Sequence, residues 1–134
     1  MLLGARFLAN VNSVNSYDVI QQVEMAAGDQ VDVYLQLVDA SLDRSAMPPG
    51  RRYVPAPVST LQVVLLNINS TKTYAKTASQ PFPTTDPSIW IFSIAATDAV
   101  KGTVNVQLVL GEGAVIRRGL LQAAIRVSPV DTGV

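Results

Sequence analysis

Regular alternation of apolar and polar side chains is the feature that most constrains what this chain can fold into. Apolar side chains occupy every second position of residues 31–37, and the same period of two recurs over residues 102–110 and 121–127. Successive side chains of a β-strand point to opposite faces, so this period is typical of a strand with one face on a core. An amphipathic helix would need a repeat near 3.6 residues. We therefore expect an all-β chain with almost no helix.

The alternating stretches, with the turn signals between them, predict an antiparallel β-sandwich. Asn67-Ile68-Asn69-Ser70 and Gly111-Glu112-Gly113 suit hairpin turns, because Asn and Gly accept positive φ angles. Pro81 and Pro83 should keep their segment out of a central strand, because proline lacks a backbone donor. The expected strands cover residues 17–25, 30–38, 59–69, 71–78, 88–96, 102–110 and 114–127.

Composition excludes most catalytic chemistry. The chain has 134 residues, the usual size of one domain, and contains neither cysteine nor histidine. It therefore lacks disulfides, thiol nucleophiles, the commonest general base and the commonest metal ligand. No glycine-rich phosphate loop and no convincing pair of catalytic carboxylates is present. We expect no enzyme activity, no catalytic residue, no metal site and no cofactor.

Charge and hydropathy point toward assembly with other proteins. Ten basic residues balance ten acidic ones, so no net field attracts nucleic acid or an anionic membrane. Charged residues make up 15% of the chain, well below the roughly 25% of ordinary domains. A chain with few charges and zero net charge tends to associate. No stretch has the length of a transmembrane helix, and the N-terminal apolar run is too broken for a signal peptide.

Two segments fall outside the sandwich pattern. Residues 1–16 are either an N-terminal arm that packs on a neighbouring subunit or an extra edge strand, and residues 17–134 form the sandwich domain. Residues 39–58 form a long loop without periodicity, which is either a solvated excursion between the sheets or a contact with a partner chain. Both segments carry apolar, arginine or tyrosine side chains of the kind found in interfaces. The candidate protein-interface residues are Leu3, Phe7, Leu8, Met47, Arg51, Arg52 and Tyr53.

Two further features have simple structural interpretations. Arg51-Arg52 and Arg117-Arg118 are the only basic pairs, and their ordinary role would be to form salt bridges across a rim. Trp90, the single tryptophan, lies in the apolar stretch of residues 88–94, where we expect it to anchor the core.

Several short motifs follow one another in a characteristic order. They are Ala27-Gly28-Asp29 leading a strand into Leu37-Val38-Asp39, then Arg52-Tyr53-Val54-Pro55-Ala56, Gln80-Pro81-Phe82-Pro83, Asp86-Pro87-Ser88-Ile89-Trp90, and the closing strands joined by Gly111-Glu112-Gly113. This order, over roughly residues 17–128, resembles the small immunoglobulin-like modules that tailed bacteriophages use in baseplates, tails and capsid decoration. The resemblance implies an immunoglobulin-like sandwich with a non-enzymatic, multi-copy role in the virion.

Sequence and resemblance together predict a structural subunit of a phage particle, located in the virion. Its expected partners are copies of itself and other virion proteins, but not nucleic acid or membrane. A tail or baseplate position is favoured over capsid decoration. A carbohydrate- or ligand-binding sandwich remains the alternative from another class, and it would require exposed aromatic side chains.

Overall fold

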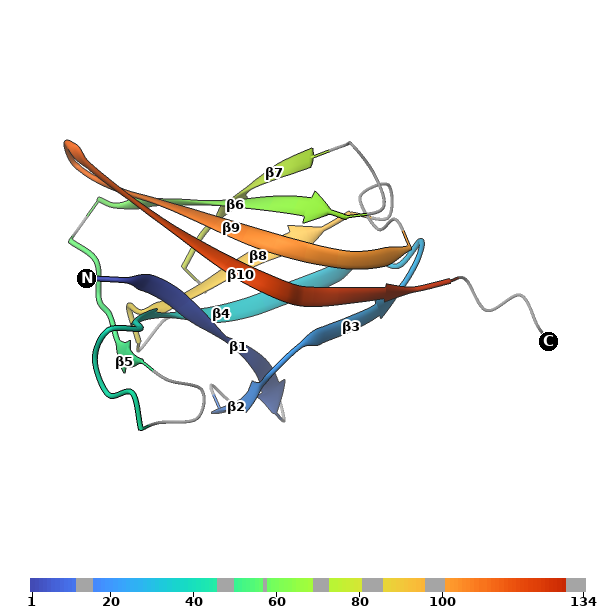
Figure 1. The fold of residues 1–134 in the computed structure, drawn as a ribbon, viewed down its shortest axis with the longest axis horizontal. Helices are drawn as coiled ribbons and strands as arrows, with labels where there is room; N and C mark the ends of the chain where they lie inside the picture. The colour runs from blue at the N-terminus through green and yellow to red at the C-terminus, as the bar shows by residue number, and fades with distance from the viewer. Residues whose placement is uncertain are drawn as a thin grey trace.

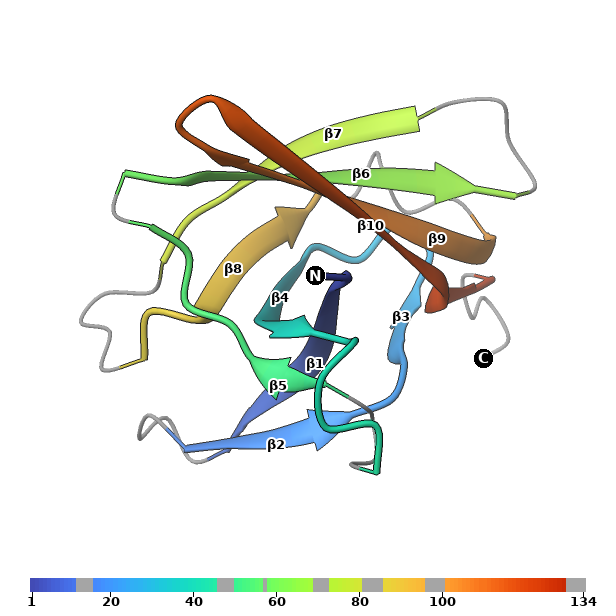
Figure 2. The same cartoon turned by 60° about the vertical axis from the view of Figure 1, so that its left-hand side comes forward.

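The computed structural model folds into two five-stranded sheets that curl around a shared interior (Figures 1 and 2). It describes residues 1–11, 16–45, 50–56, 58–68, 73–80, 86–95 and 101–129, and none of these residues is helical. Sheet A contains β1 (Leu3–Val11), β2 (Ser16–Ile20), β4 (Val31–Asp39), β5 (Arg51–Arg52) and β8 (Ile89–Ile94). Sheet B contains β3 (Val23–Ala26), β6 (Thr60–Asn67), β7 (Thr73–Ala78), β9 (Gly102–Glu112) and β10 (Val115–Ser128).

The prediction of an all-β chain is confirmed, and the two facing sheets are consistent with a β-sandwich. The alternation in β4 and β9 is confirmed, because every second side chain of these strands, and of β6, is directed into one hydrophobic cluster. The alternation expected over residues 121–127 is wrong at the bulge, where Ala123 is exposed and Ala124 is buried. Apolar side chains leave water when they reach this shared interior, which is the main favourable contribution to folding. The central members of the cluster are Leu35, Leu37, Leu61, Val63, Val106, Leu108 and Leu110, all fully buried.

Six of the seven expected strands appear where the pattern placed them, but residues 17–25 form two strands instead of one. β2 pairs with β1 in sheet A, whereas β3 pairs in parallel with the end of β10 in sheet B. The chain changes sheets at residues 21–22, where the Gln22 side chain donates to the Ala123 carbonyl at 2.9 Å. The change of sheet lets Val23 and Met25 reach the core from the sheet B side.

The described residues at the start of the segment 1–16 form β1, which packs within the chain. β1 lies inside sheet A, hydrogen-bonded to β2 on one side and to β4 on the other. Leu3 and Phe7 belong to the hydrophobic core, and Leu8 is buried on the opposite face. The inner position of β1 was not predicted from the sequence, because β2 was expected to be the first half of a longer strand over residues 17–25 and not a separate partner for β1.

β1 also crosses β10 at a point where only glycine fits. A Cβ atom at Gly119 would collide with the carbonyl oxygen of Leu3. Beyond this crossing β10 contains a bulge between Leu121 and Ile125, with Ala123 at a φ of 51°. The Ala123 amide, displaced from the ladder, donates to the Asn105 side chain at 2.8 Å.

The described part of the 39–58 loop packs against the sheets. Gly50 sits against the Val38 side chain, and Arg6 donates a hydrogen bond to the Gly50 carbonyl. β5 then extends sheet A by pairing with the end of β4. Pro81, Pro83 and Met47 lie outside the described residues.

Candidate interaction surface at one end of the sandwich

Residues 53–56, here called the crossing segment, carry the chain from sheet A to sheet B across one end of the sandwich. The segment begins where the Tyr53 amide donates to the Leu37 carbonyl at 2.9 Å. It leads toward β6, whose first residue, Thr60, pairs with Gly111 of β9. Figure 2 shows this path between the two sheets, in green. A side chain on each side holds the ends of the crossing in place.

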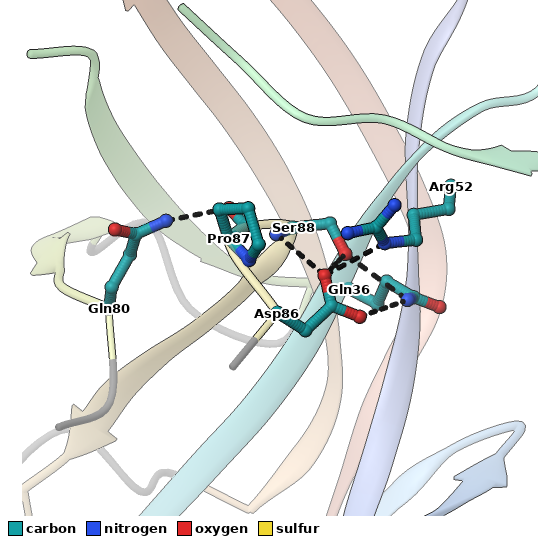
Figure 3. A network of polar contacts seen from close by, with 6 residues as sticks. All are labelled: Gln36, Arg52, Gln80, Asp86, Pro87 and Ser88. Carbon is teal, nitrogen blue, oxygen red and sulfur yellow. Dashed lines mark hydrogen bonds and ion pairs between the residues drawn. The ribbon is translucent and has the colours of Figure 1, made fainter. Parts of the chain in front are cut away.

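On the sheet A side the anchor is Asp86 (Figure 3). One carboxylate oxygen accepts from Arg52 Nε at 2.8 Å and from the Ser88 hydroxyl at 2.6 Å, and the other accepts from the Gln36 amide at 3.3 Å. Partial burial acts to raise the pKa of Asp86, but the hydrogen bonds from Ser88 and the charge of Arg52 outweigh it and lower the pKa. Asp86 therefore stays ionised and fixes Arg52 beside the start of the crossing segment.

On the sheet B side the anchor is Glu112, at the end of β9. Its carboxylate accepts from the Tyr53 hydroxyl at 2.6 Å, the Arg117 Nε at 3.0 Å and the Ala56 amide at 3.1 Å. Burial acts to raise the pKa of Glu112, but these three donors reverse the effect and lower it. Burial raises the pKa of the Tyr53 phenol, and its hydrogen bond to Glu112 adds to the rise. Glu112 thus joins both ends of the crossing segment to the last hairpin.

The predicted interface residues are separated by the fold. Leu3, Phe7 and Leu8 are buried within the chain itself, so their apolar character has an explanation without a partner. Arg52 and Tyr53 make bonds inside the chain, while Arg51 is exposed on the short strand β5. Met47 lies outside the described residues. The interface role of this set stays a prediction.

The salt-bridge interpretation of the arginine pairs is confirmed for one member of each pair. Arg52 binds Asp86 and Arg117 binds Glu112, in both cases at the rim of the sandwich. The acidic partners were missed in the sequence, although Asp86 carries a usable signal. Asp-x-Ser predicts a turn in which the carboxylate accepts from the serine two residues later, and Asp39 and Ser41 repeat the pattern at 2.6 Å.

Exposed aliphatic side chains gather at this same end of the molecule. The structure records ten exposed large apolar side chains among the described residues. Figure 1 places the N-terminus, the end of β4, the crossing segment and the tip of the β9–β10 hairpin together at the left. The strand register agrees, because Leu3 pairs with Asp39 and Val115 pairs with Glu112. Seven of the ten lie on or next to these segments: Met1, Leu2, Leu42, Val54, Val58, Val115 and Ile116.

We call these seven side chains the end patch. Exposed apolar side chains that gather on one part of a soluble protein mark interaction sites. The carboxylates beneath the patch already accept hydrogen bonds from neighbours in the chain, so they hold its segments in position. The described residues contain no cluster of three acidic side chains suited to a metal ion. Within the same residues, no helix has the length and apolar character needed to cross a membrane.

Comparisons with protein-family models, with curated proteins and with solved structures each found no match to this chain.

Proposed function

We propose that the chain is a non-enzymatic structural subunit that works by binding neighbouring subunits through its end patch. The observation that carries this proposal is the concentration of seven exposed aliphatic side chains at one end of the sandwich. Burial of such side chains against another protein releases the water around them and favours association. The low charge fraction and the zero net charge add support, because they leave little electrostatic repulsion between subunits.

We propose further that the subunit belongs to a tailed-phage particle, in its tail or baseplate, with capsid decoration as the second location. The support is the resemblance of residues 17–128 to phage immunoglobulin-like modules. The carbohydrate-binding alternative loses support, because no aromatic side chain is exposed among those the structure describes. A sugar-binding face would present such side chains to solvent.

The fold we propose is a variant of the immunoglobulin-like plan. The order β7-β6-β9-β10 in sheet B corresponds to strands C′, C, F and G of a variable-type domain, and the β4–β8 pair corresponds to strands B and E. β2 and β3 would then be one first strand divided between the sheets, with β1 inserted beside it. The chain departs from the antibody pattern in two respects, since it has no disulfide and its tryptophan lies on β8 rather than β6.

Antibody labelling of phage particles tests the proposed function. Particles are purified from a culture that expresses the gene, labelled with gold-tagged antibody against the chain, and measured by quantitative mass spectrometry. We expect several copies per particle, with label on the tail or baseplate. Label on the head surface would instead assign the decoration role. Absence of the chain from purified particles, while the cells contain it, would overturn the proposal.

A further inference from the structure

A pocket opens beside the crossing segment, within the end patch. It encloses about 400 Å³ and contains no charged side chain in its lining. Its lining combines Val54, Pro55 and Val58 with Gln80, Pro87 and Trp90. Cavities of this size with apolar walls and few polar groups are typical of ligand-binding sites.

One polar atom of this lining lacks a partner. Trp90 is 6% exposed, and its indole nitrogen has no hydrogen-bond acceptor among the residues that the structure describes. The other polar side chains have partners, because Gln80 donates to the Pro87 carbonyl at 2.6 Å and Ser59 donates to the Ala56 carbonyl at 2.5 Å. A buried N–H without an acceptor costs free energy. A carbonyl oxygen that reached this nitrogen would remove that cost.

The rim of the pocket contains a strained residue. Val58 has a φ of 65° and a side chain that is 99% exposed. This conformation is rare for a β-branched residue, and such strain collects at ligand-binding sites. A large apolar side chain held in water at the mouth of an apolar pocket is suited to contact an occupant.

We propose that the pocket receives the tip of the β9–β10 hairpin of a second copy of this chain, with Trp90 donating to a backbone carbonyl of that tip. The proposal deepens the proposed function, on which it rests for the multi-copy role. The tip carries matching chemistry, because Val115 and Ile116 are 49% and 58% exposed and residues 113–116 have no charge. Gly113 and Ala114 form the turn outside the strand ladder, so their carbonyls are available.

The position of the tip favours a reciprocal contact. Glu112, next to the tip, binds Ala56 of the crossing segment, so pocket and tip lie side by side on one end of each molecule. Two copies related by a two-fold axis can then each place a tip in the pocket of the other. Closed two-fold dimers are the commonest assemblies of identical chains.

The single tryptophan provides a specific test. The chain gives one indole N–H cross-peak in a ¹H–¹⁵N spectrum, which is recorded in a dilution series from millimolar to micromolar concentration alongside sedimentation equilibrium. We expect dimerisation together with a downfield shift of the indole proton. Ile116→Ser and Val58→Asp should each weaken dimerisation more than tenfold. Ile68→Ser, at an exposed site away from the end patch, is the matched control and should leave dimerisation unchanged.

Two results would overturn this inference. A chain that stays monomeric at millimolar concentration excludes a second copy as the occupant. A dimer whose indole signal does not move, or that resists both patch substitutions, makes its contact elsewhere. Either result leaves the proposed function standing if the chain is found in particles. Absence from particles overturns that function and leaves a measured dimer contact intact.

Discussion

Three acidic residues, Asp39, Asp86 and Glu112, hold the segments that meet at the end patch. Asp39 accepts from the Leu2 amide at 3.1 Å, which ties the N-terminus to the end of β4. Asp86 and Glu112 hold the two sides of the crossing segment through Arg52 and Tyr53. Hydrogen bonds to a charged group are stronger than neutral ones, so each carboxylate fixes several backbone positions.

Glu112→Gln should lower the free energy of unfolding by about 1–3 kcal/mol, because the amide weakens hydrogen bonds that the carboxylate accepts from Tyr53, Arg117 and Ala56. Urea unfolding followed by tryptophan fluorescence measures the change. Glu24→Gln is the control, since Glu24 is the other glutamate of the chain and lies exposed on β3. Equal stabilities for the two variants would show that the Glu112 contacts contribute little.

Among the strands, β1 and β10 bring the two sheets into contact. β1 completes sheet A between β2 and β4 and also crosses β10 at Gly119, so it contacts both sheets. The bulge in β10 lies just beyond this crossing and restores pairing with β9 from Ile125 onward. Bulges of this kind bend a strand and increase its twist.

Gly119→Ala should destabilise the fold by about 1–3 kcal/mol, the usual cost of added volume where atoms are closely packed. The new methyl group would meet the Leu3 carbonyl, and neither backbone can move without breaking a ladder. Gly4→Ala is the control, because a Cβ there makes an ordinary 3.4 Å contact with Val38. Thermal unfolding of both variants measures the difference, and a Gly119→Ala protein as stable as Gly4→Ala would refute the close crossing.

Deletion of residues 1–16 should abolish cooperative folding. The deletion removes the central strand between β2 and β4 and takes Leu3 and Phe7 out of the core, where each large-to-small change alone costs about 2–5 kcal/mol. Circular dichroism and urea titration of the truncated chain give the answer. A truncated chain with a native-like unfolding transition would restore the hypothesis of a dispensable arm.

For the whole molecule, a core shared by two sheets coexists with an apolar surface concentrated at one end. The same end gathers the three carboxylates whose pKa values are lowered. Protonation of these groups therefore acts on several segments of the end patch at once. The chain contains no histidine, so no side chain with an ordinary pKa near neutrality contributes.

Stability should be constant between about pH 6 and 8 and should fall below about pH 5. Hydrogen bonds from Ser41 lower the pKa of Asp39, and the pKa values of Asp86 and Glu112 are lowered as described above. The unfolded chain therefore binds protons at a higher pH than the folded one, and stability is lost as pH falls through the folded pKa values. Urea midpoints measured from pH 3 to 8 test this. A midpoint unchanged at pH 3 would contradict it.

Period-two alternation was enough to predict the all-β content and the buried faces of β4 and β9, because the side-chain period of a strand is a local property of the backbone. It failed in β10, where the bulge between Leu121 and Ile125 changes the register. Local signals also predicted the hairpin between β9 and β10. The two arginine pairs were expected to form salt bridges, but their partners, Asp86 and Glu112, were not predicted. Trp90 is a core residue, as its apolar stretch indicated.

Pairing between distant strands was decided only by the tertiary structure. Residues 17–25 were expected to form one strand, but β2 pairs with the neighbouring β1, whereas β3 pairs with β10 near the other end of the chain. The place of Leu3 and Phe7 in the core follows from the same pairing. The end patch likewise joins the N-terminus to the β9–β10 hairpin, and the Trp90 pocket joins residues 54–59 to residues 80–90. A sequence pattern indicates which face a side chain takes but not which partner covers it.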